Sequence, residues 1–264
     1  MTYENILVER NEAASGTTVQ ITLNRPKVLN ALNRALFIEL DVAIDELSSD
    51  DRVRVVILTG SGEKAFAAGA DIQELAHVSA VEGQQLALNG QRIFSRLENV
   101  GKPVLAAING FALGGGCELA MSATLRIASE TARLGQPEVK LGLLPGYGGS
   151  QRLSRLVGKG AALKLLLTGE MISAAEALRI GLVDEVVPAA ELLPRVKTLA
   201  ATIASMAPVA VRQCIAAVHG GYDLPLEQAL AHEAALFGLC CATEDKAEGT
   251  AAFLEKRAPI WKGK

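Results

Sequence analysis

Residues Asn109–Met121 read NGFALGGGCELAM, a largely apolar stretch that contains three consecutive glycines. Its first residue, Asn109, is also the last residue of an almost wholly apolar run, Pro103–Asn109, which is typical of a buried strand. Three consecutive glycines then lead into a segment of helix formers that carries one charged residue, Glu118. The chain is therefore expected to pass from a buried strand through a glycine turn into a helix, with free backbone N–H groups at the helix start.

The segments on either side alternate between strand-like and helix-like patterns. Strands are predicted around Val19–Leu23 and over Arg54–Thr59, Thr124–Ser129 and Leu182–Val187, and helices over Asn33–Leu47 and around Leu86–Leu97. After Pro188 the pattern is nearly all helical, with breaks at Pro208, Gly220–Gly221 and Pro225. The alternation predicts an α/β protein, with a core over residues 1–200 and a helical region over residues 201–264.

Composition excludes several classes of function. The formal net charge of the 264 residues is −3, so no basic excess indicates nucleic acid as a partner. The longest uncharged run, Pro103–Cys117, is too short and glycine-rich to span a bilayer, and the charged N-terminus resembles no targeting signal. The cysteines form no C-x-x-C pair and the three histidines are far apart, which predicts a cytoplasmic protein without a bound metal.

Three small-residue or glycine-rich segments carry the chemical information. They are Ala65–Ile72 (AFAAGADI), Asn109–Met121, and Gln136–Leu153 (QPEVKLGLLPGYGGSQRL). Small side chains let a ligand approach the backbone closely. The sequence lacks the glycine signatures of nucleotide-binding loops and the nucleophile elbow of serine hydrolases.

The acidic residues in these segments each allow two interpretations. Asp71 is either a residue in the first turn of a helix or part of a ligand-binding loop. Glu118 is either a satisfied acid near a helix terminus or a working carboxylate, because a buried glutamate is costly unless it is paired. Glu138 is either a solvated loop acid or the second member of an acid/base pair. Cys117 has no histidine close in sequence, which favours a buried and inert thiol.

The three segments match, in order and approximate spacing, motifs of the enoyl-CoA hydratase/isomerase (crotonase) superfamily. Two further stretches match as well, Asn24–Leu32 (NRPKVLNAL) and Ala251–Arg257 (AAFLEKR), so the resemblance runs nearly from end to end. Within the superfamily the chain is most similar to the short-chain enoyl-CoA hydratases, also called 3-hydroxybutyryl-CoA dehydratases. One departure is Thr124, which stands where the family usually has an acidic residue and puts a structural contact in doubt.

The resemblance implies a spiral of ββα repeats followed by C-terminal helices that build trimers, which often pair into hexamers. It also implies that the backbone N–H groups of Ala70 and Gly115 form an oxyanion hole for a thioester carbonyl. Independently, the C-terminal helices carry more apolar side chains than a small helical appendage can bury, which predicts a homo-oligomer. These side chains are Val211, Ile215, Val218, Leu226, Leu230, Leu236, Phe237 and Leu239.

Family members that hydrate enoyl thioesters carry two glutamates, which match Glu118 and Glu138. The implied reaction is the reversible syn addition of water to a trans-2-enoyl-CoA, giving a 3-hydroxyacyl-CoA in fatty-acid or related metabolism. We expect Glu118 to deprotonate the water, Glu138 to protonate C2, and the Gly146 N–H to position the water. No cofactor is expected, because coenzyme A is part of the substrate.

The resemblance also implies a set of contacts to the acyl-CoA substrate. These are Lys27, Ala68, Ala70, Asp71, Ile72, Gln73 and Gly115, together with Phe253 and Lys256 from the same or a neighbouring subunit. The nearest alternative is an enoyl-CoA isomerase or another crotonase-fold enzyme, and the presence of both glutamates argues against it. A non-catalytic role in binding acyl-CoA or RNA is a different alternative, and the net charge of −3 argues against RNA.

Overall fold

The computed structural model describes residues 3–264, which form two sheets covered by helices. The larger sheet has the order β1-β2-β3-β5-β7-β10 and the smaller one β4-β6-β8-β9. The strands are β1 (Ile6–Ala13), β2 (Gly16–Leu23), β3 (Val53–Gly60), β4 (Ala65–Ala67), β5 (Val104–Ile108), β6 (Phe111–Leu113), β7 (Leu125–Ser129), β8 (Arg133–Gly135), β9 (Met171–Ser173) and β10 (Glu185–Val187).

The helices follow the strands in a regular order. They are α1 (Arg34–Ser49), α2 (Ile72–Leu75), α3 (Ala80–Glu98), α4 (Gly115–Met121), α5 (Gly149–Thr168), α6 (Ala174–Arg179), α7 (Leu192–Ala204), α8 (Pro208–Gly221), α9 (Leu226–Cys241) and α10 (Glu244–Glu255). Short 3₁₀ turns lie at Pro26–Val28 (η1), Pro137–Leu141 (η2) and Ala189–Glu191 (η3).

Each turn of the chain adds one strand to each sheet and then a helix. The first such turn runs β3, β4 and α3, the second β5, β6 and α4, and the third β7, β8 and α5. In both sheets the strands of successive turns pair in parallel. The spiral of ββα repeats expected from the family resemblance is therefore confirmed, and equivalent points of successive turns lie next to each other.

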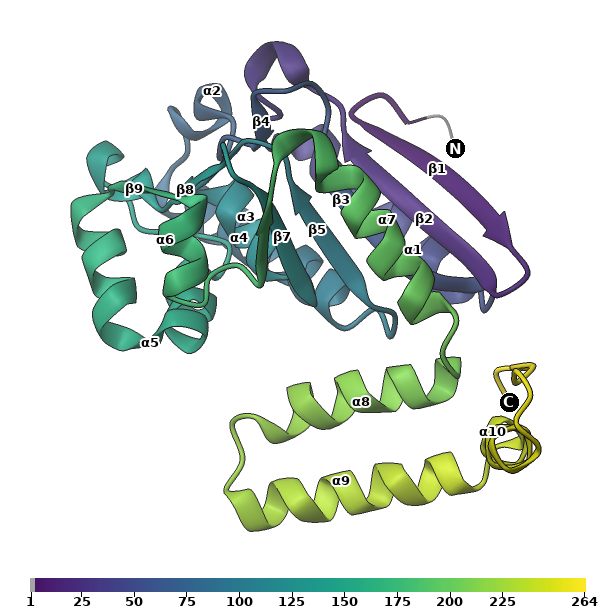
Figure 1. Cartoon of the computed structure of the whole chain (residues 1–264). Coiled ribbons are helices and arrows are strands. Elements are labelled where there is room, and N and C mark those ends of the chain that lie inside the picture. Colours follow the sequence, from purple (N-terminus) through teal and green to yellow (C-terminus); the bar gives the residue numbers. More distant parts are fainter. Residues whose placement is uncertain (1–2) are drawn as a thin grey trace.

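Two hydrophobic clusters fix the larger sheet between layers of helices. Alternate residues of β3 point to opposite faces, as the pleat of a strand requires. Val55 and Ile57 belong to a cluster with Val196 of α7, which crosses that face of the sheet (Figure 1). Val56 and Leu58 belong to the main core, which also holds the apolar faces of α1 and α3. The central strands β3 and β5 are therefore buried on both faces of the sheet.

Helix α1 begins where the sequence predicted, because Asn33 caps it through a hydrogen bond from the Leu36 N–H to its Oδ1, 3.0 Å long. Helix α3 begins with a capping box formed by Ser79 and Glu82. Both predicted helices and most predicted strands are confirmed. The strand predicted over Leu182–Val187 is shorter, because Leu182 and Val183 donate to the Ala177 carbonyl in a turn and pairing begins only at Glu185.

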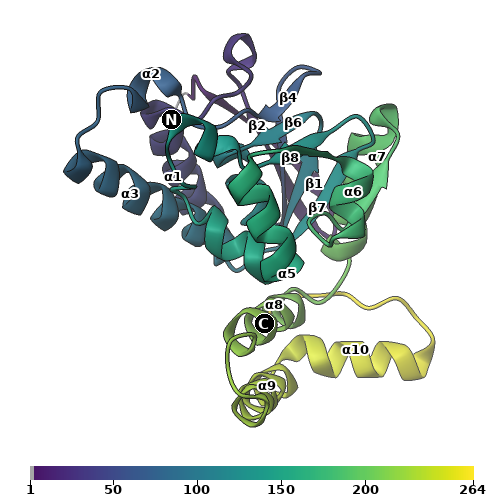
Figure 2. The same cartoon turned by 90° about the vertical axis from the view of Figure 1, so that its left-hand side faces the viewer.

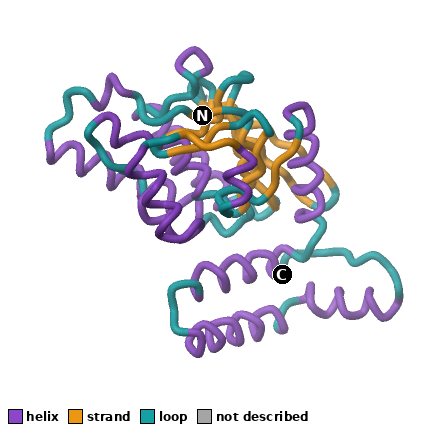
Figure 3. The backbone as a smooth tube through the Cα atoms, turned by 60° about the vertical axis from the view of Figure 1, so that its left-hand side comes forward, coloured by secondary structure: helices purple, strands orange, loops and turns teal. Residues whose placement is uncertain are grey.

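The three C-terminal helices extend away from the core as a separate layer (Figures 2 and 3). Helix α8 buries only Gly221, and α9 buries no residue. Exposed apolar side chains lie on both helices, among them Val218 of α8 and Phe237 of α9. The helical region therefore matches the sequence prediction in content, while its role in assembly stays a prediction.

Within residues 3–264, no single helix has the length and apolar composition needed to cross a membrane. The segments Ala189–Ala204 and Pro208–Gly221 pass that test only as a pair, and they meet at a bend of 106°.

We predict that Gly116→Ala destabilises the protein by about 1–3 kcal/mol, because overpacked side chains must displace their surroundings. A Cβ on Gly116 would lie 1.9 Å from the carbonyl oxygen of Ala67, a rigid backbone atom of β4. Urea unfolding measures the change. Gly160→Ala is the control, since a Cβ there meets no atom within 4 Å, and it should change stability by less than about 1 kcal/mol. Equal effects of the two substitutions would contradict this account.

Candidate active site

A cavity of about 450 Å³ lies where the strands of the smaller sheet end. Its lining includes Ala68–Ala70 after β4, Gly114–Gly115 after β6, and the carboxylates Glu118 and Glu138. Much of the remaining wall is apolar and is contributed by α2, α3 and the loop before α5. The spiral thus brings together three segments that the sequence singled out separately.

Two backbone N–H groups in this cavity are free to bind a ligand. We find no hydrogen bond from the amides of Ala70 and Gly115 to another group of residues 3–264. The chain beside each is nevertheless fixed, because the Asp71 N–H donates to Leu32 and the Gly114 N–H to Gly135, both over 2.9 Å. Unpaired donors on a fixed backbone are suited to an oxygen that gains negative charge.

Gly114 precedes α4, and any other residue at this position would strain the backbone. Its φ of +49° lies in the left-handed region that favours glycine. A Cβ there would also lie 2.7 Å from Oε1 of Glu138. The absence of a side chain therefore lets the Glu138 carboxylate approach the start of α4 and the free N–H of Gly115.

Glu118 projects from α4 and is only 1% exposed. Its Oε1 accepts two hydrogen bonds of 2.7 Å, from the N–H groups of Tyr147 and Gly149 at the start of α5. Burial, together with the nearby charge of Glu138, raises the pKa of Glu118 to about 7, although the two N–H donors favour the ionised form. The sequence did not single out these two donors, because almost every residue type has a backbone N–H group, so residue identity does not show which of them bind a carboxylate.

Glu138 lies in η2 and is half-buried. Burial raises its pKa to about 7, so near neutral pH a proton can reside on either carboxyl of the pair. With the Gln136 amide oriented so that its nitrogen faces Glu138, that nitrogen donates to both carboxylate oxygens, over 3.1 and 3.2 Å, and Gln136 is only 1% exposed. Sequence reasoning missed Gln136, since a neutral amide before a proline matches no chemical pattern by itself.

Cys117 precedes Glu118 on α4, but its thiol is not suited to a catalytic role. It is buried, and burial raises the pKa of its thiol to about 12. The thiol is therefore protonated at neutral pH and unsuited to nucleophilic attack, as the sequence predicted. None of the described His, Cys, Asp and Glu side chains forms a group of three that could hold a metal ion.

The segment that carries Lys27 lies against the loop after β4. The Ala68 N–H donates to the Leu29 carbonyl over 3.0 Å, and the Arg25 guanidinium binds the Asp71 carboxylate over 3.1 Å. Asp71 is the N-cap of α2 rather than a residue in its first turn. Its side chain is therefore already engaged, which leaves its backbone for a ligand, while Lys27, Ile72 and Gln73 are exposed next to it.

Phe253 and Lys256 are not brought to this cavity. They belong to the end of α10, in the layer of helices that extends away from the core (Figure 2), and Phe253 is 83% exposed.

Gly146 does line the cavity, and its carbonyl accepts a hydrogen bond from Gln91 over 2.8 Å. At the unusual Thr124, the hydroxyl oxygen accepts a hydrogen bond from the Val104 N–H over 3.0 Å, which fixes the start of β5.

Comparison with known proteins identifies relatives of this chain. Residues 13–264 match the family model described as Enoyl-CoA hydratase/isomerase. A short-chain-enoyl-CoA hydratase of Clostridium acetobutylicum is 50% identical over 257 residues, which is 97% of each chain. A crotonyl-CoA hydratase of Syntrophomonas wolfei is 49% identical, again over 97% of each chain.

The solved structures agree in fold. The crystal structure of an enoyl-CoA hydratase from Bacillus anthracis superposes with a TM-score of 0.94 at 42% sequence identity, covering 99% of this chain and 100% of that one. The α/β class and the crotonase-like spiral predicted from the sequence are thus confirmed. The chain belongs to the enoyl-CoA hydratase/isomerase family.

The raised pKa values predict how stability depends on pH. Both carboxyls titrate near 7 in the folded protein, against 4.5 for an ordinary glutamate, so between about pH 5 and 7 the unfolded chain binds fewer protons. The free energy of unfolding should therefore fall as pH rises through this window. Glu118→Gln should reduce that fall by about 1–3 kcal/mol, as measured by urea unfolding at several pH values.

Glu63→Gln is the matched control, because Glu63 lies on an exposed loop. It should leave the pH dependence of wild-type stability in place. A Glu118→Gln variant with the same dependence as the wild type would contradict the assignment of a raised pKa to Glu118.

Proposed function

We propose that this protein is an enoyl-CoA hydratase that adds water reversibly to trans-2-enoyl-CoA thioesters, giving 3-hydroxyacyl-CoA. One observation carries the proposal: two free backbone N–H groups and two carboxyls with raised pKa values line the same cavity. The printed names of the relatives, a short-chain-enoyl-CoA hydratase and a crotonyl-CoA hydratase, support it.

In this proposal the thioester carbonyl oxygen binds between the N–H groups of Ala70 and Gly115. As water attacks C3, negative charge moves onto that oxygen, and each preorganised donor stabilises the transition state by about 3–4 kcal/mol. The donors belong to successive turns of the spiral, so the packing of β4 against β6 sets their relative position. Hydrogen bonds from this oxyanion hole to the carbonyl oxygen also withdraw electrons from the double bond, which makes C3 a better electrophile.

The two glutamates divide the proton transfers. Glu118 is held by two N–H groups that favour its ionised form, so it accepts the proton of the attacking water. Glu138 delivers a proton to C2, and the amide of Gln136 holds its carboxyl in place. Syn addition requires water and proton to reach one face of the double bond. The Gly146 N–H, on the loop that supplies the Tyr147 donor, positions the water.

The coenzyme A portion binds along the outer edge of the cavity. Lys27 attracts its phosphates, and the backbone from Ala70 to Gln73 forms a wall for the adenine end. The remaining cavity volume and its apolar lining suit a short acyl chain. No cofactor takes part, because the carboxylates and backbone donors supply all the required chemistry and CoA arrives with the substrate.

The division into a core over residues 1–200 and an oligomerisation region over residues 201–264 belongs to the same proposal. Exposed apolar side chains on α8 and α9 support a trimer or a pair of trimers. In such an assembly Phe253 and Lys256 would contact the CoA of a neighbouring subunit. A cytoplasmic location and a place in fatty-acid or related acyl-CoA metabolism stay predictions.

We predict that Glu118→Gln and Glu138→Gln each lower kcat by about 10²–10⁴-fold with little change in KM, because neither carboxylate holds CoA. The rate is measured with crotonyl-CoA by following the enoyl-thioester absorbance. The double variant should lose much less than the product of the two effects, since both groups act in one transition state. Glu63→Gln serves as the control and should keep wild-type activity.

Exchange of the C2 proton with solvent separates the two roles. Glu138→Gln should abolish exchange on a saturated acyl-CoA, whereas Glu118→Gln should retain more of it, because Glu138 faces C2. Full hydratase activity in Glu138→Gln would contradict the two-carboxylate mechanism and would favour an isomerase-like reaction with one glutamate.

We predict a homo-oligomer at micromolar concentration. Phe237→Glu places a charge on an exposed apolar site of α9 and should shift the protein toward smaller species, because the charge would need to be desolvated in an interface. Mass measurement in solution distinguishes monomer, trimer and hexamer. A wild-type monomer would overturn the assembly proposal, while leaving the oxyanion hole and the glutamates untouched.

A further inference from the structure

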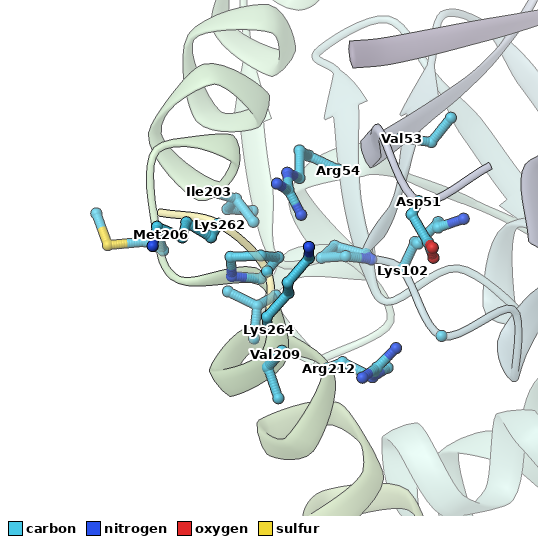
Figure 4. A pocket seen from close by; sticks show the side chains of 15 residues that line it. Asp51, Val53, Arg54, Lys102, Ile203, Met206, Val209, Arg212, Lys262 and Lys264 are labelled. Carbon is cyan, nitrogen blue, oxygen red and sulfur yellow. The ribbon is translucent and has the colours of Figure 1, made fainter. Parts of the chain in front are cut away.

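A second pocket, of about 320 Å³, lies where strands of the larger sheet begin (Figure 4). Its lining includes Val53 at the start of β3 and Pro103 just before β5, whereas the acyl-CoA cavity follows the ends of the spiral strands. The first turn of α8 and the last three residues of the chain complete the wall. The pocket therefore lies between the core, the C-terminal helices and the C-terminal tail.

The lining of this pocket is strongly basic. Arg54, Lys102, Arg212, Lys262 and Lys264 contribute positive charge, and Asp51 is the one acidic residue among the described lining residues. These cations come from four separate parts of the chain, and Figure 4 draws them around the same space. Like charges repel, so bringing them together is unfavourable unless an anion compensates.

Internal carboxylates compensate this charge only around Lys102, where the charges of Asp50 and Asp51 act. Lys262 pairs with Glu244 over 3.0 Å, outside the lining, but we find no ion pair for Arg54, Arg212 or Lys264 within the described residues. Lys102 uses its ammonium to donate to carbonyls at the end of α1, including that of Asp50 over 2.8 Å, so it contributes charge rather than free donors. Burial lowers the pKa of Lys102, and the charges of Arg212 and Arg10 act in the same direction, whereas the carboxylates of Asp50 and Asp51 oppose the shift.

The guanidinium groups supply the donors that remain. The Nε of Arg54 makes one long hydrogen bond to the Ser15 carbonyl, 3.4 Å, and its Nη1 lies 3.4 Å from where a Cβ on Gly263 would stand. Arg212 passes beside Gly101, whose added Cβ would lie 3.6 Å from its Cδ. Planar guanidinium groups match the geometry of phosphate oxygens and bind them in a bidentate manner.

We propose that this basic pocket binds the phosphate groups of a small anionic ligand, at a site separate from the acyl-CoA cavity. The ligand joins Arg54 of the core to Arg212 of α8 and to the tail at Lys264. Its binding therefore holds the C-terminal helices in one position relative to the core, across the bend at Ser205–Ala207. This inference does not depend on the proposed hydratase activity.

Isothermal titration of the full-length protein with pyrophosphate tests the site, with orthophosphate and ADP as further probes. We expect one equivalent per chain and a rise in the melting temperature. The double variant Arg54→Gln/Arg212→Gln should weaken binding at least tenfold and abolish the rise, while keeping wild-type activity with crotonyl-CoA. Arg52→Gln is the matched control, since Arg52 is exposed, lies outside the pocket and should leave binding unchanged.

Lys27→Gln distinguishes this site from the proposed CoA phosphate contact. If Lys27→Gln abolishes pyrophosphate binding and the double variant does not, the phosphate occupies the acyl-CoA site and the proposal is wrong. An equal rise in melting temperature with sodium chloride at matched ionic strength would also overturn it, because it would reflect screening of the repelling charges rather than a bound ligand. Binding of ADP but not of pyrophosphate or orthophosphate would overturn the assignment to phosphate groups.

Discussion

The close approach of two backbones, at Ala67 of β4 and Gly116 of α4, is the constraint on which the site depends. A Cβ on Gly116 would lie 1.9 Å from the Ala67 carbonyl oxygen, so only glycine permits the contact. Because β4 and α4 belong to successive turns of the spiral, this contact sets the spacing of the turns. It thereby brings the free N–H groups of Ala70 and Gly115 to the same cavity, which neither turn could achieve alone.

Burial of Glu118 has an energetic cost that the same packing offsets. A buried carboxylate without partners would be strongly destabilising. Here the start of α5 provides two N–H donors at 2.7 Å, so the ionised form is tolerated while burial keeps the pKa near 7. Gly149 lets the backbone approach the carboxylate closely, because a Cβ there would lie 2.9 Å from Oε1 of Glu118. Stability and the capacity to exchange a proton near neutral pH thus arise from one arrangement.

The two ends of the larger sheet lead to pockets of opposite charge. The spiral loops after its strands lead to the cavity with two carboxylates, whereas the ends where β3 and β5 begin adjoin a pocket lined by cations. The C-terminal helices contact the core near that basic end and expose apolar side chains elsewhere. Their position therefore depends on few contacts within the chain, and a bound anion or a neighbouring subunit would fix it.

Features of this protein whose cause is local could be predicted from its amino-acid sequence. Hydrophobic spacing predicted α1 and α3, unbroken apolar runs predicted β3 and β5, and the motif order predicted the family and the residues Glu118 and Glu138 as candidates. These features follow from the period of a helix, the burial of parallel strands and the demand for glycine at close contacts.

Only the tertiary structure decided which of these features meet. Gln136 and the N–H groups of Tyr147 and Gly149 contact the glutamates across 2 to 31 positions of sequence, and no residue pattern marks them. The strand predicted over Leu182–Val187 begins only at Glu185, because Leu182 and Val183 donate their N–H groups to the Ala177 carbonyl in a turn. The basic pocket likewise joins cations from Arg54 to Lys264. Contacts at such separations depend on how the turns of the spiral stack, and that stacking is fixed by packing rather than by any one segment.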